Sequence, residues 1–394
     1  MTAPASATES TATALPRFHW FLPPRNDSLT PGAVTTLGAE GSSTPPNLLD
    51  HLTEVAVAAE QGGFHGALTP IGIGCPDPWV LCSAVAARTK DFSFIVAVRP
   101  SLQSATLTAQ QADTFRRLHR GRVILNIVTG GNPAEQAGYG VHVPHDERYD
   151  ITDESLRAIR PLLQGDKVEL DGKHMKLVGS QLVDPATEPV PIFFGGASEK
   201  AVQVAAEQAD TYLLWGEPLP AISERIDTVR AAAAAAGRHL DFGLRLHVIT
   251  RDTAEEAWQV AADIQGSFDP EEVAKAQAHK ATMDSVGQAR MGQLHGTELP
   301  SDVEDLVIAP NLWAGIGLMR EGVGTALVGS HDEVADRLVE YAELGISEFI
   351  LSGYPHREEA TRVGRDLLPL IHQKLSATAG DVTSSAGDGD AAIA

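Results

Sequence analysis

The sequence has very little cysteine: its 394 residues include only Cys75 and Cys82. Two cysteines are too few to cross-link a chain of this length into a disulfide framework, so we expect a reducing compartment. The amino-terminal MTAPASATESTATALPR lacks the basic start and apolar stretch of a signal peptide. No later run approaches the ~18 apolar residues that a membrane helix needs. These absences predict a cytoplasmic protein without a membrane segment.

Positive charge is also scarce, since 30 Lys and Arg residues stand against 52 Asp and Glu residues and give a formal net charge of −22. Such a chain repels polyanions unless it concentrates its cations in a patch. Here the basic residues are scattered, without runs or interleaved aromatics. Nucleic acids and anionic lipid surfaces are therefore not expected partners, and any anionic ligand should be small and bound locally.

Several catalytic signatures are missing. Without HExxH, CxxC or a tight His/Asp cluster, no metal site is expected. Without a GxSxG elbow, a serine hydrolase is disfavoured. No GxGxxG follows the first apolar run, where a dinucleotide-binding sheet would carry it. A cofactor, if there is one, must be held in another way.

The composition is that of a globular protein: 43% of the residues are hydrophobic, and 36 Gly and 24 Pro are spread along the chain. Only the two ends differ. Residues 1–16 and 376–394 are rich in Ala, Ser, Thr, Gly and Asp, with almost no large apolar side chains to offset the entropy of ordering. We expect two disordered tails around one domain at 17–375.

Within that domain, short β-branched or aromatic runs alternate with longer amphipathic stretches. The runs predict eight strands, at 18–24, 66–72, 93–100, 123–130, 192–196, 211–216, 242–250 and 349–355. The stretches predict helices at 48–63, 77–89, 106–120, 147–164, 198–209, 219–237 and 332–345. This alternation favours an α/β fold, a (β/α)8 TIM barrel. A doubly wound open sheet is the alternative that periodicity does not exclude.

Residues 251–325 break the alternation. They hold two helix-like patterns, a loop and the segment PNLWAGIGLMREGVGTALVG, and so form a large insertion between the seventh and eighth strands. On a barrel such an insertion lies over the carboxyl-terminal face, where active sites are found. Its glycines would allow movement, so we expect a lid, an oligomer contact, or both.

Arg245 and His247 are the strongest candidates for chemistry. They are separated by one residue on the seventh strand, so both side chains lie on the same face, while Leu244 and Leu246 face the helices. A buried arginine is costly unless it is paired, so its presence inside a barrel needs a reason. An anionic substrate provides one; a salt bridge to an acidic residue of a neighbouring strand is the structural alternative.

Four further side chains are weaker candidates when taken alone. Tyr354 and His356, after the eighth strand, share a face if the alternation continues, and either can donate or move a proton. Arg320 lies among glycines and is either a mobile cation that closes over an anion or a solvated loop charge. Cys75 lies between a strand and a helix, where its thiol is either exposed with a lowered pKa or a small buried apolar group.

A phosphate cradle is predicted at FFGGAS, where a strand gives way to a helix. The free backbone N–H groups of Gly196 and Ala197 and the hydroxyl of Ser198 would converge there at a helix amino terminus. A Gly-Gly pair after a strand is common, so this signal needs support. Asn126 and Thr129 supply some, because they end the fourth strand on the same rim and could hydrogen-bond a planar polar ring.

Longer segments resemble a known family. From about residue 18 to 372 the chain resembles the bacterial luciferase-like flavin monooxygenases, and within them the alkanesulfonate monooxygenase group. The resemblance is carried by FHWFLPP, FIVAVRPSLQSATLTAQQADTFRRLHRGRVILNIVTGGNP, HDERYD, FFGGAS, FGLRLHVITRDTAEEAW, MDSVGQARM, PNLWAGIGLMREGVGTALVG and ILSGYPH. Matches of this length, in this order, are more than chance similarity would produce.

The resemblance implies a (β/α)8 barrel assembled into a homodimer or homotetramer. It implies that reduced FMN comes from a separate NAD(P)H-dependent flavin reductase, that dioxygen is the oxidant, and that an organosulfonate is cleaved to an aldehyde and sulfite. It assigns catalytic positions to Arg245, His247, Arg320, Tyr354 and Cys75. It assigns FMN binding to Asn126, Tyr149, Gly196, Ala197 and Ser198, and Thr129 lies on the same rim.

Two segments depart from the family pattern. After the first strand, Thr-His-Gly-Asp is replaced by PPRNDS, which puts Arg25 or a neighbour where the family often has His. Beside Cys75, Glu-Asp-Ala-Trp is replaced by Pro76-Asp77-Pro78-Trp79. Both sites face the substrate in the family, so we expect a substrate that differs in size or shape. A luciferase-like oxygenase of another organosulfur compound, a deazaflavin-dependent oxidoreductase and a non-catalytic binding protein stay open as alternatives.

Overall fold

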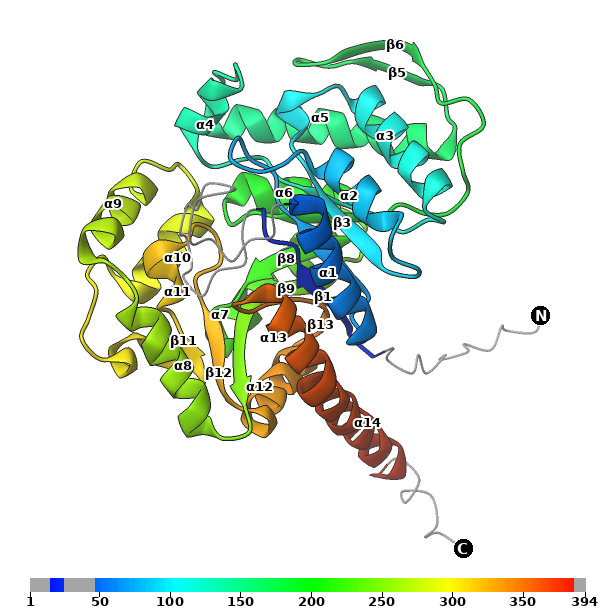
Figure 1. Ribbon diagram of the computed structural model, residues 1–394. Helices are drawn as coiled ribbons and strands as arrows, with labels where there is room; N and C mark the ends of the chain where they lie inside the picture. Colours follow the sequence, from blue (N-terminus) through cyan, green and yellow to red (C-terminus); the bar gives the residue numbers. More distant parts are fainter. Residues whose placement is uncertain (1–14, 25–46, 386–394) are drawn as a thin grey trace, which may run out of the picture.

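The computed structural model of the protein describes residues 15–24 and 47–385. Its main sheet closes into a ring in the order β9-β13-β1-β2-β3-β4-β7-β8, and β8 pairs with β9 to complete it. All neighbours in the ring are parallel. The predicted (β/α)8 barrel is therefore confirmed, and the open-sheet alternative is wrong. Figure 1 shows the ring surrounded by helices.

The eight predicted strands are the eight strands of this ring. Their bounds are β1 (Arg17–Phe21), β2 (Gly66–Thr69), β3 (Ser93–Val98), β4 (Val123–Ile127), β7 (Ile192–Gly195), β8 (Thr211–Trp215), β9 (Asp241–Arg251) and β13 (Ile346–Ser352). Most of the predicted strands extend a few residues past the carboxyl ends seen in the structure. Those extra residues lie on the rim, where the chain leaves the sheet and site residues concentrate.

The predicted helices are also present. The helices that follow ring strands are α1 (Leu48–Gln61), α2 (Pro78–Ala86), α3 (Ala105–Leu118), α5 (His145–Gln164), α6 (Glu199–Gln208), α7 (Leu219–Ala235) and α13 (His356–Arg362), with the short α4 (Pro133–Gly138) and the 3-10 turn η1 (Pro100–Leu102) between them. Helix α12 (His331–Glu343) follows a strand of the insertion region and leads into β13. Several begin at side-chain caps visible in the sequence, such as Asp77, Ser104 and Ser198. These caps fix where each rim loop ends.

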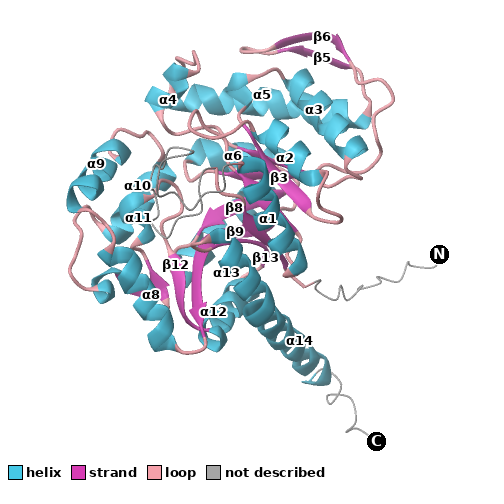
Figure 2. Cartoon of the chain, viewed as in Figure 1, coloured by secondary structure: helices cyan, strands magenta, loops and turns pink. Residues whose placement is uncertain are grey.

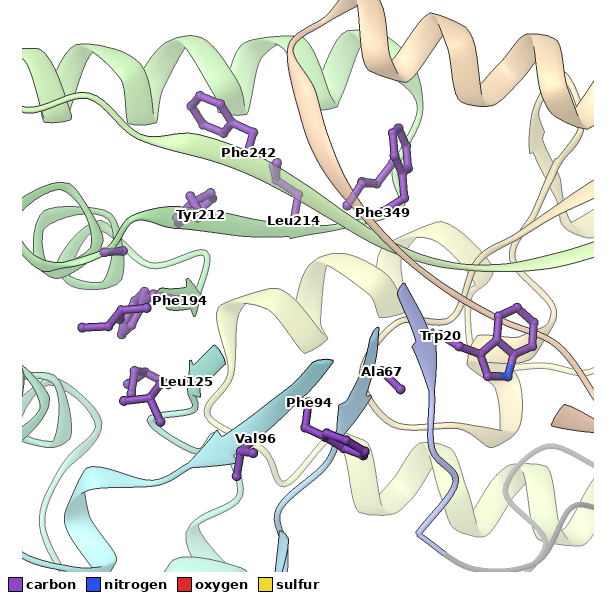
Figure 3. Packing of buried hydrophobic residues seen from close by; sticks show 14 of the residues in the cluster. Trp20, Ala67, Phe94, Val96, Leu125, Phe194, Tyr212, Leu214, Phe242 and Phe349 are labelled. Carbon is purple, nitrogen blue, oxygen red and sulfur yellow. The ribbon is translucent and has the colours of Figure 1, made fainter. Parts of the chain in front are cut away.

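Two layers of side chains fill the molecule. Residues on the outer face of the ring pack against the helices, and Figure 3 labels some of them, including Phe94, Leu125 and Phe194. A smaller cluster fills the barrel interior with Ile95, Ile124, Phe193 and Ile350, joined by the partly buried Leu68 and Leu213. The interior is therefore a packed core, and only the carboxyl-terminal mouth above it can hold a ligand.

The insertion extends the sheet as well as covering it. Strand β9 is long: its first half pairs with β8, and its second half, from His247 to Arg251, pairs with β12 (Ala326–Ser330). Strand β12 was not among the predicted strands, because its GTALVG run lies within the irregular segment PNLWAGIGLMREGVGTALVG. The rest of the insertion is α8 (Ala254–Gly266), α9 (Pro270–Lys280), α10 (Val286–His295), η2 (Val303–Leu306), β10 (Val307–Ala309), β11 (Leu312–Trp313) and α11 (Ile316–Met319).

Two other features were not expected. The hairpin β5 (Val168–Asp171) and β6 (Lys176–Ser180) projects beyond α3 and α5, as Figure 2 shows. After the π-helical turn η3 (Val363–Leu367), helix α14 (Leu368–Ser385) continues past residue 376, so the prediction of a loose tail from that point is wrong as far as Ser385. Extending a helix that is already nucleated costs little, which explains its length. The predicted tails at 1–14 and 386–394 lie outside the described residues.

Candidate active site

Strand β9 carries two polar side chains into the barrel mouth. Arg245 and His247 are 4% and 1% exposed, while Leu244, Leu246 and Val248 belong to the core between the strands and the helices. The orientation predicted from alternation is therefore confirmed. Gly243 precedes them on the same face, and a Cβ there would lie 2.5 Å from Cδ2 of Leu213. Because Gly243 has no side chain, Leu213 can pack against the strand directly beneath Arg245.

Arg245 has no carboxylate partner among the described residues. Its Nη1 donates to the carbonyl of Leu246 at 2.7 Å, and its guanidinium lies 4.8 Å from the centroid of the Phe21 ring. Nη2 is buried and makes no hydrogen bond within residues 15–24 and 47–385. Burial, followed by the charge of Arg320, lowers the pKa of Arg245 well below its ordinary value.

The structural alternative for Arg245 was a salt bridge to an acid on a neighbouring strand. The acid on neighbouring β13 is Glu348, which is 1% exposed. It lies toward the opposite end of the barrel, where it accepts from Arg17 and lies 2.7 Å from Nε2 of His19. The ion pair that would have given Arg245 a structural role is therefore made by other residues.

Arg320 brings a second cation to the same ring. It follows α11 in the insertion, and its guanidinium lies 5.1 Å from the Phe21 centroid. Its Nη1 makes one long hydrogen bond, 3.4 Å to the carbonyl of Val323. Two guanidiniums thus contact one aromatic ring, and in the described part of the chain neither is neutralised by a carboxylate. A small anion would relieve the repulsion between them.

His247 is held on two sides. Its Nδ1 lies 2.7 Å from the hydroxyl of Ser352, and its ring stacks on Tyr354 with centroids 5.5 Å apart and planes at 18°. Nε2 faces the carbonyl of Val323 without a hydrogen bond of normal geometry. Burial, then the neighbouring cations, lower the pKa of His247 well below its ordinary value. The imidazole is therefore neutral at neutral pH and can accept a proton.

The chain leaves the sheet after β13 earlier than the predicted strand, 349–355, implied. The strand ends at Ser352, and His356 already begins α13. Tyr354 and His356 still meet, with ring centroids 5.1 Å apart, and His356 also lies 5.6 Å from the Phe21 ring. Phe21 and Ser352 were not predicted as site residues. Their position at the carboxyl ends of strands could have indicated the site, but neither residue type indicates chemistry by itself.

A second group of residues forms at the amino terminus of α6. A Cβ on Gly196 would lie 2.6 Å from Cβ of Ala201 and 3.1 Å from the hydroxyl of Tyr149. Ser198 caps the helix by accepting from the Ala201 N–H at 3.2 Å, and it hydrogen-bonds Tyr149, whose pKa is raised by burial. The carbonyl of Ala197, next in the chain, accepts from Arg225 at 3.1 Å. The predicted Tyr149, Gly196, Ala197 and Ser198 are thus brought together.

Asn126 lies near the end of β4, and Thr129 follows that strand. Asn126 is paired in register with Ala97 of β3 and Phe193 of β7, on the inward face. Thr129 turns its hydroxyl toward Thr152 of α5, at 3.4 Å. Asn126 is therefore placed to contact a ring in the mouth, whereas the Thr129 hydroxyl faces a helix.

Cys75 lies apart from the arginines. It is half-buried and lines a cavity of about 400 Å³ with Trp79, Arg99 and Tyr139, among others. Arg99 ends β3 and lies 2.8 Å from a carboxylate oxygen of Glu135. Cys75 follows β2 and shares this cavity with the carboxyl end of β3, which lies across the ring from the β9 strand of Arg245. Within the described residues, no group of three His, Cys, Asp or Glu side chains could hold a metal ion.

The model of the luciferase-like monooxygenases matches residues 17–348. The chain belongs to this family. Solved structures with the same fold include a riboflavin lyase, with 22% identity, a TM-score of 0.72 and coverage of 92% of each chain. DmoA from Hyphomicrobium sulfonivorans has 20% identity and a TM-score of 0.73 over 91% of this chain and 88% of its own. A long-chain alkane monooxygenase has 21% identity and a TM-score of 0.70 over 92% of each chain.

These comparisons support the family part of the resemblance, and the similarity to the solved structures shows the fold alone. The membership agrees with an inward-facing polar mouth at the carboxyl ends of the strands. In the described ranges, no helix is long and apolar enough to cross a membrane. The alkanesulfonate group is a finer assignment than the comparisons make.

Proposed function

We propose that the protein is a two-component monooxygenase that uses reduced FMN and dioxygen to cleave the carbon–sulfur bond of an alkanesulfonate. An alkanesulfonate, dioxygen and reduced FMN would give an aldehyde, sulfite, water and oxidised FMN. The observation that carries the proposal is the pair of guanidiniums on the Phe21 ring, Arg245 and Arg320, without a carboxylate partner among the described residues. A sulfonate carries one charge and three acceptor oxygens, which suits two arginines.

His247 and Tyr354 would act beside the bound sulfonate. The neutral imidazole can accept a proton, and Ser352 at Nδ1 fixes the orientation of the ring, leaving Nε2 toward Val323 and Arg320. Tyr354 stacks on that ring and brings its hydroxyl to the same rim. A proton leaving the carbon next to sulfur during aldehyde formation would be taken at His247.

The residues at α6 fit the phosphate of FMN. Gly196 leaves the space that a Cβ would fill, Ser198 begins a helix of ten residues, and the Tyr149 hydroxyl lies beside both. Free N–H groups at such a terminus bind phosphate. Asn126 lies on β4, the strand next to β7 that leads to this cradle, and from there it would contact the flavin ring. Bound reduced FMN would supply the electrons that activate dioxygen.

Two partners belong to the proposal. A separate NAD(P)H-dependent reductase would provide reduced FMN, since the sequence has no dinucleotide fingerprint of its own. A homodimer or homotetramer is supported by apolar side chains that α2 and α3 leave exposed, namely Val80, Leu107 and Leu118. Covering them with a second copy would bury apolar area, which favours association.

The test is sulfite release by the full-length protein, supplied with reduced FMN in air, across short and long alkanesulfonates. The matched control variant is R251M, because Arg251 lies on the same strand but pairs with Glu359 at 2.9 Å. We expect release from at least one sulfonate, retained by R251M and lost by R245M. No release from any of them would reject the substrate. Tight binding of a deazaflavin with indifference to reduced FMN would instead support the hydride-transfer alternative.

A further inference from the structure

Lys280, the last residue of α9, is buried, which is unusual for lysine. It is 8% exposed, and its Nζ contacts the carbonyl oxygens of Gly317 and Leu318, the latter at 3.2 Å. Gln277, one turn earlier on α9, donates to the carbonyl of Leu318 at 2.7 Å. In the described ranges no carboxylate pairs with Lys280. The hydrogen bonds of its Nζ there go to these two carbonyls.

The carbonyls that Lys280 and Gln277 bind belong to α11, which has four residues and ends at Met319. A helix this short does not form by itself, and the carbonyls at its end have no partner within the helix. Arg320 follows directly, and its N–H donates to the carbonyl of Ile316 at 3.0 Å. The position of the Arg320 side chain therefore depends on donors from outside α11.

The other side of α11 is closely packed. A Cβ on Gly317 would lie 2.4 Å from Cδ2 of His295, and the Gly317 N–H donates to the carbonyl of Gly324 at 2.9 Å. The N–H of Gly322 donates to the side chain of Gln288 at 2.8 Å. The turn that carries Arg320 is thus held against α10, and Lys280 holds it from α9.

The end of α9 is itself tied to the barrel. Just beyond it, the N–H of Asp284 donates to the carbonyl of Gly131 in the loop after β4, at 3.0 Å. The Asp284 carboxylate lies 2.7 Å from Arg148 of α5. Lys280 therefore connects α11 to a fixed point. Burial lowers the pKa of Lys280 to about 8. Because this value is still above neutral pH, the side chain is mainly protonated there.

We propose that Lys280 is a positioning residue for Arg320. Its ammonium group and the Gln277 amide bind the end of α11 and keep the Arg320 guanidinium over Phe21, where the sulfonate binds. The inference rests on the proposed function for its effect on the substrate. The contact itself, which we call the α9 latch (Gln277 and Lys280 on the carbonyls of Gly317 and Leu318), is independent of the substrate.

The test variant is K280M, which keeps a long side chain and removes its donors. The matched control is K275M, because Lys275 lies on the same helix but is exposed and pairs only with Glu272 among the described residues. In the substrate-free full chain, we expect backbone amides of residues 316–320 to exchange hydrogen for deuterium about tenfold faster in K280M, and at the wild-type rate in K275M.

With substrate, K280M should raise the KM for the sulfonate roughly tenfold and change kcat less than about threefold, because charge-assisted hydrogen bonds that position the binding arginine are lost. The dissociation constant for FMN should not change. Unchanged amide exchange would overturn the latch. Faster exchange with an unchanged KM would also overturn the proposal, since Lys280 would then be merely structural.

If K280M does not fold, Q277L removes the neighbouring donor and decides by the same two measurements. Failure of the wild-type protein to release sulfite from any alkanesulfonate would reject the proposed function alone. The exchange comparison contains no substrate, so it would still support or overturn the α9 latch.

Discussion

Replacing Arg245 with Met should stabilise the ligand-free protein and at the same time weaken sulfonate binding. The two effects have one cause. Arg245 is 4% exposed, lies near a second cation at Arg320, and has no carboxylate partner in the residues described. Among the described residues, hydrogen bonds to two carbonyls and the contact with the Phe21 ring offset its burial. A methionine fills similar space without a charge.

The size of the stability effect follows from the desolvation of a buried charge. Replacing buried ionic groups with apolar residues of similar volume is often stabilising by about 1–4 kcal/mol, and we take about 2 kcal/mol here. An unfolding entropy of about 2 cal/mol/K per residue corresponds to about 0.8 kcal/mol/K for 394 residues. The Tm of R245M should therefore rise by about 2–3 °C.

Thermal unfolding with and without an alkanesulfonate measures both effects. Ligand that binds only the folded protein raises the Tm of the wild type by mass action, and the same concentration should raise that of R245M much less. Loss of a charge-assisted hydrogen bond of about 1.5–3 kcal/mol predicts a dissociation constant at least tenfold higher.

The control for this experiment is R251M, which breaks the ion pair with Glu359 and should lower the Tm while leaving the affinity for sulfonate unchanged. A Tm of R245M several degrees below that of the wild type would show that Arg245 has a structural counter-ion. If sulfonate also stabilised R245M as it does the wild type, the anion site proposed here would be refuted.

Three further changes test other parts of the site. Gly196→Ala should raise the FMN dissociation constant at least tenfold, since the new Cβ would lie 2.6 Å from Cβ of Ala201; an unchanged flavin titration would contradict the cradle. Ser352→Ala should lower kcat about tenfold with little change in KM, because Nδ1 of His247 loses its partner; equal steady-state constants would contradict that role. Burial lowers the pKa of His295 to about 4, so between that pH and about 6.5 the unfolded chain binds a proton that the folded chain does not, and acidification should destabilise the protein. His295→Gln should flatten the dependence of unfolding free energy on pH in this window by up to about 1.4 kcal/mol per pH unit, and an unchanged slope would show that His295 is not buried in the neutral form.

Much of the barrel could be predicted because its signals are local. Each strand of the ring is a short apolar run, and caps such as Asp77 and Ser198 mark the starts of helices. The strand β12 and the hairpin β5–β6 were missed for a different reason. Both are stabilised by pairing with a partner that the local pattern does not identify, β9 in one case and each other in the second.

Part of the candidate site could also be predicted from the sequence, because its signals are local. Alternation along β9 was enough to send Arg245 and His247 inward, and the strand-to-helix change at FFGGAS was enough to place Ser198 at a cap. Phe21 and Ser352 were not selected, because an aromatic ring or a hydroxyl acquires a role only through what lies across the barrel from it. The distances that give them roles join β1 or β13 to residues of β9 and the insertion.

The sequence by itself determined the order of the eight ring strands and the helices between them, the inward face of β9, the shortage of positive charge and the absence of common metal and nucleotide motifs. These follow from periodicity and composition, which are properties of neighbouring residues. The tertiary structure decided that Glu348 pairs with Arg17 and His19 rather than with Arg245, and that α11 delivers Arg320 to the same ring as Arg245. Such choices depend on which distant side chains closure of the barrel and packing of the insertion bring within reach, and no local pattern records them.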